Sequence, residues 1–135
     1  MKLLFVCRGN VGRSQMATTI YNSIHPNGSD SAGTVVVNFP GETVGAVGEG
    51  SNNIITAMKE IGFDITNNPR DVIDEKSLSK YDKIIIMAEH DSVQDYLKNS
   101  PKSEFWDVEN PKGMNLEDTR IVRDIIAQKI KQLTA

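Results

Sequence analysis

Two short apolar segments restrict what this chain can fold into more than any other feature. Residues 3–7 and 83–88 are almost entirely apolar, and the second segment is rich in isoleucine. A strand with one face in water alternates apolar and polar residues, whereas a strand buried on both faces does not alternate. Both segments are also far shorter than the ~20 apolar residues of a membrane-spanning helix. They therefore predict central strands of a parallel β-sheet that is covered on both faces.

Helical periodicity occupies the segments between and after these strands. Apolar residues recur at the spacing of one helix face within 16–24, 54–61, 93–97 and 121–133. Further strands are expected near 31–35 and 104–108. This alternation predicts an α/β fold, a single doubly wound domain over residues 1–135 with about four parallel strands and helices on both faces. Such sheets bind ligands at the carboxyl ends of their strands.

Local signals predict where several helices begin and end. The predicted boundary residues are Gly62 after the second helix, a capping box of Asp91 and Gln94 before the third, and Asn115 with Asp118 before the last. Four glycines within 40–50 predict a mobile loop. That segment lacks the preceding apolar strand and the following Lys-Ser or Lys-Thr of a nucleotide-binding loop.

Composition excludes several classes of function. The 135 residues include 15 Lys and Arg against 18 Asp and Glu, and their mixed distribution leaves no basic face for nucleic acid. The first apolar segment is too short for a signal peptide, so we expect a cytoplasmic protein with no membrane partner. The only cysteine is Cys7, which rules out an intrachain disulfide and a cysteine-based zinc site. We expect neither a metal nor a cofactor.

The turn that follows the first strand carries the candidate chemistry. It ends a buried strand and opens a helix, so backbone amides can converge on one anion above the helix N-terminus. The amides concerned are those of Arg8, Gly9, Asn10, Val11, Gly12, Arg13 and Ser14. The guanidinium of Arg13 is expected to return over Cys7 and to hold two oxygens of a tetrahedral oxyanion. These groups favour the thiolate of Cys7, which is the nucleophilic form.

Asn10 and Ser14 are predicted to support this turn. Asn10 tolerates the left-handed backbone that a tight cradle requires, and Ser14 can donate a hydrogen bond to the sulfur of Cys7. A cysteine that ends a buried strand is otherwise more often a small core residue. Two glycines, an asparagine and a second basic residue in a strand-turn-helix position favour anion binding instead.

A resemblance to a known family begins at this turn, where residues 6–16 read Val-Cys-Arg-Gly-Asn-Val-Gly-Arg-Ser-Gln-Met. The segment resembles the phosphate-binding loop of the low-molecular-weight protein tyrosine phosphatases and of the related arsenate reductases. The resemblance continues through 31–34, 57–65, 81–87 and 106–113, nearly the whole chain, and is closer to the arsenate reductases. It implies that Cys7 attacks phosphorus, that Arg13 binds the phosphoryl oxygens, and that a cysteinyl-phosphate forms.

The general acid of the resembled phosphatases is missing here. Those enzymes place an aspartic acid before a late proline, where it protonates the leaving group, and this chain has Asn110 before Pro111. Glu109 and Asp107 are the candidate substitutes. The aromatic residues that phosphatases place after this proline are also absent, which leaves Phe39 or Trp106 as candidates to line a substrate pocket.

Two further functions remain open at this point. Thioredoxin-linked arsenate reductases use additional cysteines, and relatives often carry a second cysteine where this chain has Gly12. An arsenate reductase with this sequence would therefore depend on a small external thiol. Loss of the general acid is also compatible with a phosphate- or phosphoprotein-binding module without turnover. The ligands expected from these alternatives are phosphate, arsenate or a phosphomonoester.

Overall fold

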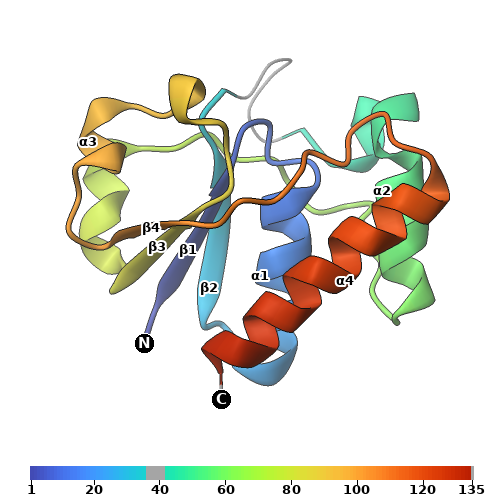
Figure 1. Cartoon of the computed structure of the whole chain (residues 1–135), viewed down its shortest axis with the longest axis horizontal. Helices are drawn as coiled ribbons and strands as arrows, with labels where there is room; N and C mark the ends of the chain where they lie inside the picture. The colour runs from blue at the N-terminus through green and yellow to red at the C-terminus, as the bar shows by residue number, and fades with distance from the viewer. Residues whose placement is uncertain (36–41, 135) are drawn as a thin grey trace.

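The computed structural model describes residues 1–35 and 42–134. Its centre is a four-stranded parallel sheet in the order β2-β1-β3-β4 (Figure 1). The strands are β1 (Leu3–Cys7), β2 (Ser29–Gly33), β3 (Lys83–Ile86) and β4 (Ser103–Phe105). The α/β fold predicted from the sequence is confirmed, and the two apolar segments form neighbouring strands at its centre.

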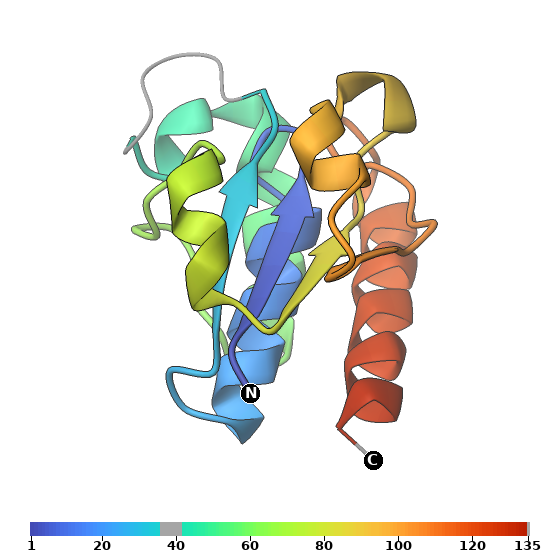
Figure 2. The same ribbon diagram turned by 90° about the vertical axis from the view of Figure 1, so that its left-hand side faces the viewer.

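Helices of very different length cover the two faces of the sheet (Figures 1 and 2). One face carries the long helices α1 (Arg13–Ile24), α2 (Glu49–Glu60) and α4 (Leu116–Leu133). The other face carries the 3-10 helices η2 (Glu75–Lys80) and η3 (His90–Ser92) and the short α-helix α3 (Asp95–Lys98). A further 3-10 helix, η1 (Gly45–Val47), precedes α2.

Strand β1 divides the hydrophobic core into two halves. Successive side chains of a strand point to opposite faces, and each β1 residue is at most 2 % exposed. Leu3 and Phe5 belong to the cluster formed with α1, α2 and α4. Leu4 and Val6 belong to the cluster on the face of α3. Burial on both sides explains why the sequence of β1 does not alternate.

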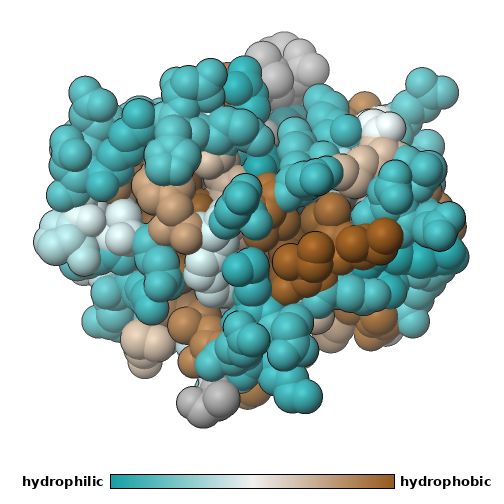
Figure 3. All heavy atoms as spheres, in the orientation of Figure 1, coloured by the Kyte–Doolittle hydropathy of each residue, from teal (hydrophilic) through white to brown (hydrophobic). Residues whose placement is uncertain are grey.

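Helix α4 buries only part of its apolar stripe. Ile121 is 53 % exposed and Ile125 is 43 % exposed, and Figure 3 shows hydrophobic residues gathered over this helix. The prediction that the apolar residues of 121–133 share one buried helix face therefore includes too many residues, because Ile121 and Ile125 lie on the outer face. Within residues 1–35 and 42–134, no helix has both the length and the hydropathy needed to cross a membrane.

The predicted helix boundaries are confirmed at two of three places. Asn115 caps α4, because its Oδ1 accepts the backbone N–H of Asp118 at 2.7 Å. Gly62 follows the end of α2 in the left-handed conformation, with φ of 95°. The predicted capping box is wrong, because Asp91 lies inside η3 and Gln94 is itself the residue that precedes α3.

The segment 40–50 is more ordered than its glycines suggest. Residues 40 and 41 lie outside the described residues, but η1 and the start of α2 fall within the remainder. A Cβ at Gly45 would lie 2.7 Å from Cγ2 of Thr66, and Gly48 precedes α2 with φ of 86°. These glycines permit a close approach and a turn. The prediction of a loop is wrong for Gly45–Val47 and for the residues of α2, which are helical.

The two outer strands lie earlier in the chain than predicted. β2 starts at Ser29 because the side chain of Asn22 accepts the Ser29 N–H at 2.9 Å and donates to its carbonyl oxygen at 3.1 Å. β4 ends at Phe105, and the following segment bends toward α1, where the carbonyl oxygen of Val108 accepts a hydrogen bond from Arg13. Both differences are tertiary effects on edge strands.

Candidate active site

The site begins where β1 ends. Cys7 is the last residue of β1 and Arg13 is the first residue of α1, so the turn between them lies at the carboxyl end of a central strand. Asn10 has φ of 53°, the left-handed conformation predicted for it. A Cβ at Gly12 would lie 2.8 Å from Cγ of Pro111. The absence of a side chain at Gly12 therefore lets a distant loop pack directly on the turn.

A chain of hydrogen bonds reaches the sulfur of Cys7. Its Sγ lies 2.9 Å from Oγ of Ser14, and Asn10 donates a side-chain amide proton to the same oxygen at 2.7 Å. Because the oxygen accepts from Asn10, the hydroxyl proton of Ser14 can point toward the sulfur. A donor directed at Sγ stabilises the thiolate. The contact between Ser14 and the sulfur of Cys7 is the predicted one, and the hydrogen bond from Asn10 to Ser14 is an addition to it.

Asn10 also ties the turn to the neighbouring segments. It is fully buried, and its Nδ2 donates a second hydrogen bond to Oγ of Ser31 in β2 at 3.0 Å. Its Oδ1 accepts the backbone N–H of Asp71 at 2.8 Å and Nε2 of Gln15 at 3.2 Å. Both donors and both acceptor positions of this amide are used. The turn is held in place by its own side chains.

Arg13 is buried, with 2 % of its surface exposed, and most of its donors are engaged. Nη1 donates to the carbonyl oxygens of Met87 and Val108 and to Oε1 of Glu89 at 3.0 Å, and Nη2 lies 3.3 Å from Oε2 of Glu89. The guanidinium is thus not the free two-pronged clamp that the spacing suggested. Its Nε, however, is buried without a hydrogen-bond partner among the described residues, and Arg13 lines the same cavity as Cys7.

Glu89 is the acidic partner of Arg13. Its partial burial opposes ionisation, but hydrogen bonding to Arg13 and attraction to Arg13 and Arg8 outweigh this effect and hold the pKa of Glu89 below its usual value. The carboxylate is therefore ionised near neutral pH, and it orients the guanidinium through two oxygens. Such a pair presets the position of Nε.

The cavity at Cys7 is small and basic. It has a volume of about 110 Å³ and is lined by four cationic side chains, those of Arg8, Arg13, Arg70 and Lys112. Arg70 is 4 % exposed, and its Nη2 donates to the carbonyl oxygen of Gly9 at 2.9 Å. Among the described residues that line the cavity, none has a carboxylate or an imidazole. Its size and charge suit a tetrahedral oxyanion.

The loop around Pro111 separates the acid candidates from the cavity. Asn110 lines the cavity at Cys7, and its Oδ1 accepts the backbone N–H of Lys112 at 3.1 Å. Asp107 and Glu109 instead line a groove beside α4. Trp106 lines a third cavity together with Arg13 and Glu89, and Asp107 lines this cavity as well. The other aromatic candidate, Phe39, lies outside the described residues.

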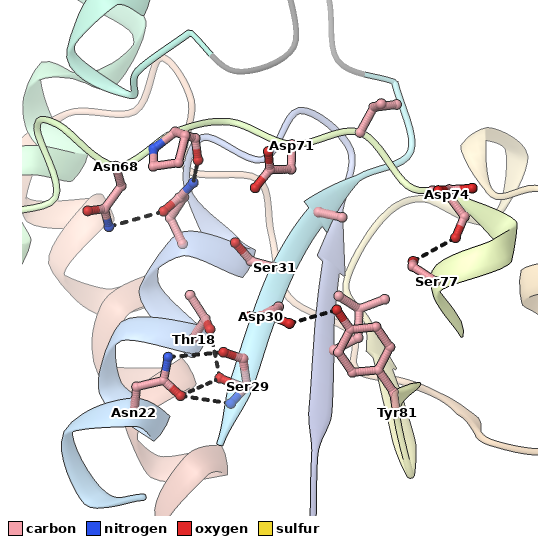
Figure 4. A pocket seen from close by; sticks show the side chains of 15 residues that line it. Thr18, Asn22, Ser29, Asp30, Ser31, Asn68, Asp71, Asp74, Ser77 and Tyr81 are labelled. Atoms are coloured by element: carbon pink, nitrogen blue, oxygen red, sulfur yellow. Dashed lines mark hydrogen bonds between the residues drawn. The ribbon is translucent and has the colours of Figure 1, made fainter. Parts of the chain in front are cut away.

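A larger cavity on the outer side of β2 has the opposite charge character (Figure 4). Its volume is about 410 Å³, and Asp30, Asp71 and Asp74 are among its lining residues. Tyr81 donates its hydroxyl proton to Asp30 at 2.7 Å, and burial together with Asp30 raises the pKa of Asp71. Carboxylates repel an oxyanion. The smaller cavity at Cys7 is therefore the better anion site of the two.

Three residues of the site were missed by sequence reasoning. Glu89 follows the extension of β3, and the rule that ligands bind at the carboxyl ends of parallel strands could have drawn attention to it. Lys112 lies two residues after Asn110, in the segment that lacks the aromatic residues of the phosphatases, and that absence gave no reason to expect a cation in the site. Arg70 carries no local signal, because it lies in an irregular segment that only the tertiary fold brings beside Gly9.

Comparison with known proteins identifies related sequences along the full chain. A family model described as low molecular weight phosphotyrosine protein phosphatase matches residues 2–135. Arsenate reductase 2 of Staphylococcus saprophyticus is 34 % identical over 133 residues, which cover 96 % of this chain and 93 % of the relative. The arsenate reductase of Brevibacillus brevis is 33 % identical over 132 residues, covering 96 % and 91 % of the two chains.

Solved structures give the same two groups of relatives. A low molecular weight protein tyrosine phosphatase from T. tengcongensis superposes with a TM-score of 0.81 at 27 % identity, covering 99 % of this chain and 97 % of its own. An arsenate reductase in its phosphate-binding state superposes with a TM-score of 0.78 at 26 % identity, covering 98 % and 96 %. Sequence and structure thus point to one family with two activities.

Proposed function

Because the chain belongs to the low-molecular-weight phosphotyrosine protein phosphatase family, we propose that it hydrolyses phosphomonoesters through a cysteinyl-phosphate on Cys7. The observation that carries this proposal is the 2.9 Å contact between Sγ of Cys7 and Oγ of Ser14 in a cavity lined by four cations. The relatives that are phosphatases support hydrolysis as the reaction. A free thiolate also needs a reducing compartment, which supports a cytoplasmic location.

The first step forms the covalent intermediate. The thiolate of Cys7 attacks phosphorus, the new S–P bond forms, and the bond between phosphorus and the ester oxygen breaks. Nε of Arg13 and the backbone amides of residues 8–14 are the donors for the phosphoryl oxygens. Ser14 donates to the sulfur before attack and stabilises the thiolate again when it is released.

The second step returns the free enzyme. Water attacks phosphorus, the S–P bond breaks with its electron pair going to sulfur, and dihydrogen phosphate and the thiolate are the products. The cations around the cavity hold the phosphoryl group in place throughout. No side chain beyond those already described is assigned to this step.

Arsenate reduction is the second candidate, and the two arsenate reductases at 34 % and 33 % identity favour it. Cys7 would displace hydroxide from arsenate and form a sulfur–arsenic bond. A small external thiol would then attack the sulfur of Cys7, so that arsenite leaves with the electron pair and a mixed disulfide forms. A second thiol would reduce that disulfide. Arsenate-dependent oxidation of a small thiol is the readout that separates this function from ester hydrolysis.

The decisive experiment compares wild type with Cys7→Ser on p-nitrophenyl phosphate, whose leaving group needs little proton assistance. We expect turnover by wild type and none by Cys7→Ser. Phosphate binding, measured by calorimetry, should persist in Cys7→Ser because the variant keeps the cations and amides of the cavity. Full turnover by Cys7→Ser would contradict the nucleophile. Phosphate binding by wild type with no turnover and no thiol oxidation would instead identify a binding module.

A further inference from the structure

The leaving-group side of the cavity at Cys7 has cations where a proton donor is needed. Besides Cys7 and the glycines, its described lining consists of arginines, lysine, valines and Asn110. Glu89 is paired with Arg13, and Glu109 lines a groove beside α4. Asp107 lines that groove and the cavity formed with Glu89 and Trp106, but not the cavity at Cys7. Among the described residues that line the cavity at Cys7, none is therefore a carboxylic acid.

Asn110 is held in a defined position in this lining. Its Oδ1 accepts the backbone N–H of Lys112 at 3.1 Å, a local turn in which the side-chain oxygen is occupied. The remaining Nδ2 group donates hydrogen bonds but does not give up a proton. Asn110 can therefore orient a leaving oxygen without protonating it. Aspartate would form the same turn through the same oxygen, so Asn110→Asp is a conservative change in shape.

The cations near Asn110 suit a leaving group that departs with a negative charge. Arg8 and Lys112 line the cavity and are exposed at its mouth, where they attract an anion as it leaves. An arginine is never a useful acid, and a lysine ammonium is a far weaker acid than a carboxylic acid. The lining therefore stabilises an anionic leaving group and offers little protonation.

These features distinguish between classes of phosphate ester. An alkyl phosphate must release an alkoxide, a strong base that needs a proton in the transition state. A phenyl phosphate releases a weaker base, and an acyl phosphate releases a carboxylate, which is stable without a proton. We propose that this site acts on acyl phosphates, in which the phosphoryl group is bonded to a carboxyl oxygen. This inference rests on the phosphatase function proposed above.

The reaction on an acyl phosphate balances without a proton donor. The thiolate of Cys7 and the acyl phosphate give cysteinyl-phosphate and a free carboxylate, and the P–O bond is the one that breaks. Water then converts the cysteinyl-phosphate into the thiolate and dihydrogen phosphate. Asn110 donates a hydrogen bond to the departing carboxylate in the first step, and Lys112 provides the neighbouring positive charge.

The test measures kcat/KM for wild type on acetyl phosphate, p-nitrophenyl phosphate, phenyl phosphate and a phosphoserine peptide, with the uncatalysed rates subtracted. The site is expected to act fastest on acetyl phosphate and p-nitrophenyl phosphate. Phenyl phosphate should be slower by about 10²- to 10⁴-fold, the usual contribution of a general acid, and the peptide slower still. Equal kcat/KM for acetyl phosphate and phenyl phosphate would overturn the inference.

Asn110→Asp adds the missing acid and should make kcat/KM depend less on the leaving group. Phenyl phosphate turnover should rise by about 10²-fold or more, with a new loss of rate at high pH as the acid ionises. Acetyl phosphate turnover should not rise, because its carboxylate leaves without a proton and the variant loses the Nδ2 donor. Asn115→Asp is the matched control, because it makes the same charge change at the N-cap of α4, where aspartate also caps well. An equal effect of Asn110→Asp on all substrates would contradict the assignment.

The outcomes separate this inference from the function on which it rests. Turnover that is absent for every substrate, or that Cys7→Ser retains, overturns the phosphatase function itself. Turnover that depends on Cys7 but not on the leaving group preserves that function and overturns only the preference for acyl phosphates. The wild-type series decides the question even if Asn110→Asp does not fold.

Discussion

Two contacts between arginine and glutamate hold different parts of this molecule. At the carboxyl ends of the strands, Glu89 pairs with Arg13. Between α2 and α4, Glu60 pairs with both Arg120 and Arg123. In the helix contact, no buried side-chain nitrogen among the described residues lacks a partner, whereas Nε of Arg13 is buried without one.

The difference is what we expect if the pair of Glu89 and Arg13 belongs to the proposed site and the contact between α2 and α4 is only structural. The contact between α2 and α4 leaves no buried side-chain donor without a partner among the described residues, and the side chain of Arg120 is partly exposed to water. The contact between Glu89 and Arg13 leaves the Nε–H donor of Arg13 without a protein acceptor among the described residues. A buried donor without an acceptor costs folding free energy. A site that retains such a donor is arranged for an acceptor that comes from outside. The comparison predicts opposite consequences of mutation at the two places.

Arg13→Lys should have the largest effect on activity. Lysine keeps the positive charge but cannot pair with Glu89 and present a second donor in the position of Nε. We expect kcat/KM for p-nitrophenyl phosphate to fall by about 10²- to 10³-fold, as for loss of one oxyanion donor. Arg120→Lys is the matched control and should leave kcat/KM unchanged. Equal losses in the two variants would remove the distinction between the contacts.

Glu89→Gln should have a smaller effect on activity. Glutamine keeps an oxygen that can accept from Arg13 but loses the negative charge, and the half-exposed position of Glu89 limits the value of that charge. We expect kcat/KM at neutral pH to fall by less than about tenfold. A loss as large as that of Arg13→Lys would show that Glu89 does more than orient the guanidinium.

The pH dependence of this pair has a defined sign. Because the folded protein holds the pKa of Glu89 below its usual value, the pair stabilises the fold above the pKa of the unfolded chain and is lost as pH falls through the lower folded value. The difference in Tm between wild type and the Glu89→Gln variant should therefore shrink as the solution is acidified. A gap in Tm that widens on acidification would contradict this origin.

Glu60→Gln should affect stability alone. Hydrogen bonds from Arg120 and Arg123, and the attraction of both charges, lower the pKa of Glu60 from 4.5 to about 2. Desolvation acts in the opposite direction and is outweighed. This contact therefore stabilises the fold above pH 4.5, and the stabilisation is lost as pH falls from 4.5 to about 2. Tm of Glu60→Gln should lie below that of wild type at neutral pH and meet it near pH 2. Its kcat/KM should equal the wild-type value.

The parts of this molecule that depend on local sequence were predictable. The apolar segments of β1 and β3 identified the sheet centre, because a strand that is buried on both faces needs apolar residues at successive positions. The contact of Ser14 with the sulfur of Cys7 and the left-handed backbone of Asn10 are as predicted, because a short turn between a strand and a helix has few ways to close. The hydrogen bond from Asn10 to Ser14 was not predicted. The cap at Asn115 followed from the same kind of short-range geometry.

The parts that depend on distant segments were not predictable in the same way. Glu89 reaches Arg13 from a position 76 residues further along the chain, and no spacing rule connects them. The glycines before α2 suggested flexibility. In the folded chain, however, the backbone at Gly45 packs so closely against Thr66 that a side chain would not fit there. Asp107 and Glu109 differ from Asn110 in the cavity they line, because successive side chains of an extended loop point in different directions.

The packing of Gly12 on Pro111 restricts the routes by which this protein can evolve. One base change converts a glycine codon into a cysteine codon, so mutation readily supplies a second thiol beside Cys7. In this fold the new Cβ would lie 2.8 Å from Cγ of Pro111 and 3.1 Å from Cδ1 of Ile54. The loop that carries Asn110 would have to shift to make room. A descendant that protects its nucleophile with a neighbouring thiol must therefore remodel that loop first, and its leaving-group chemistry would change along the way.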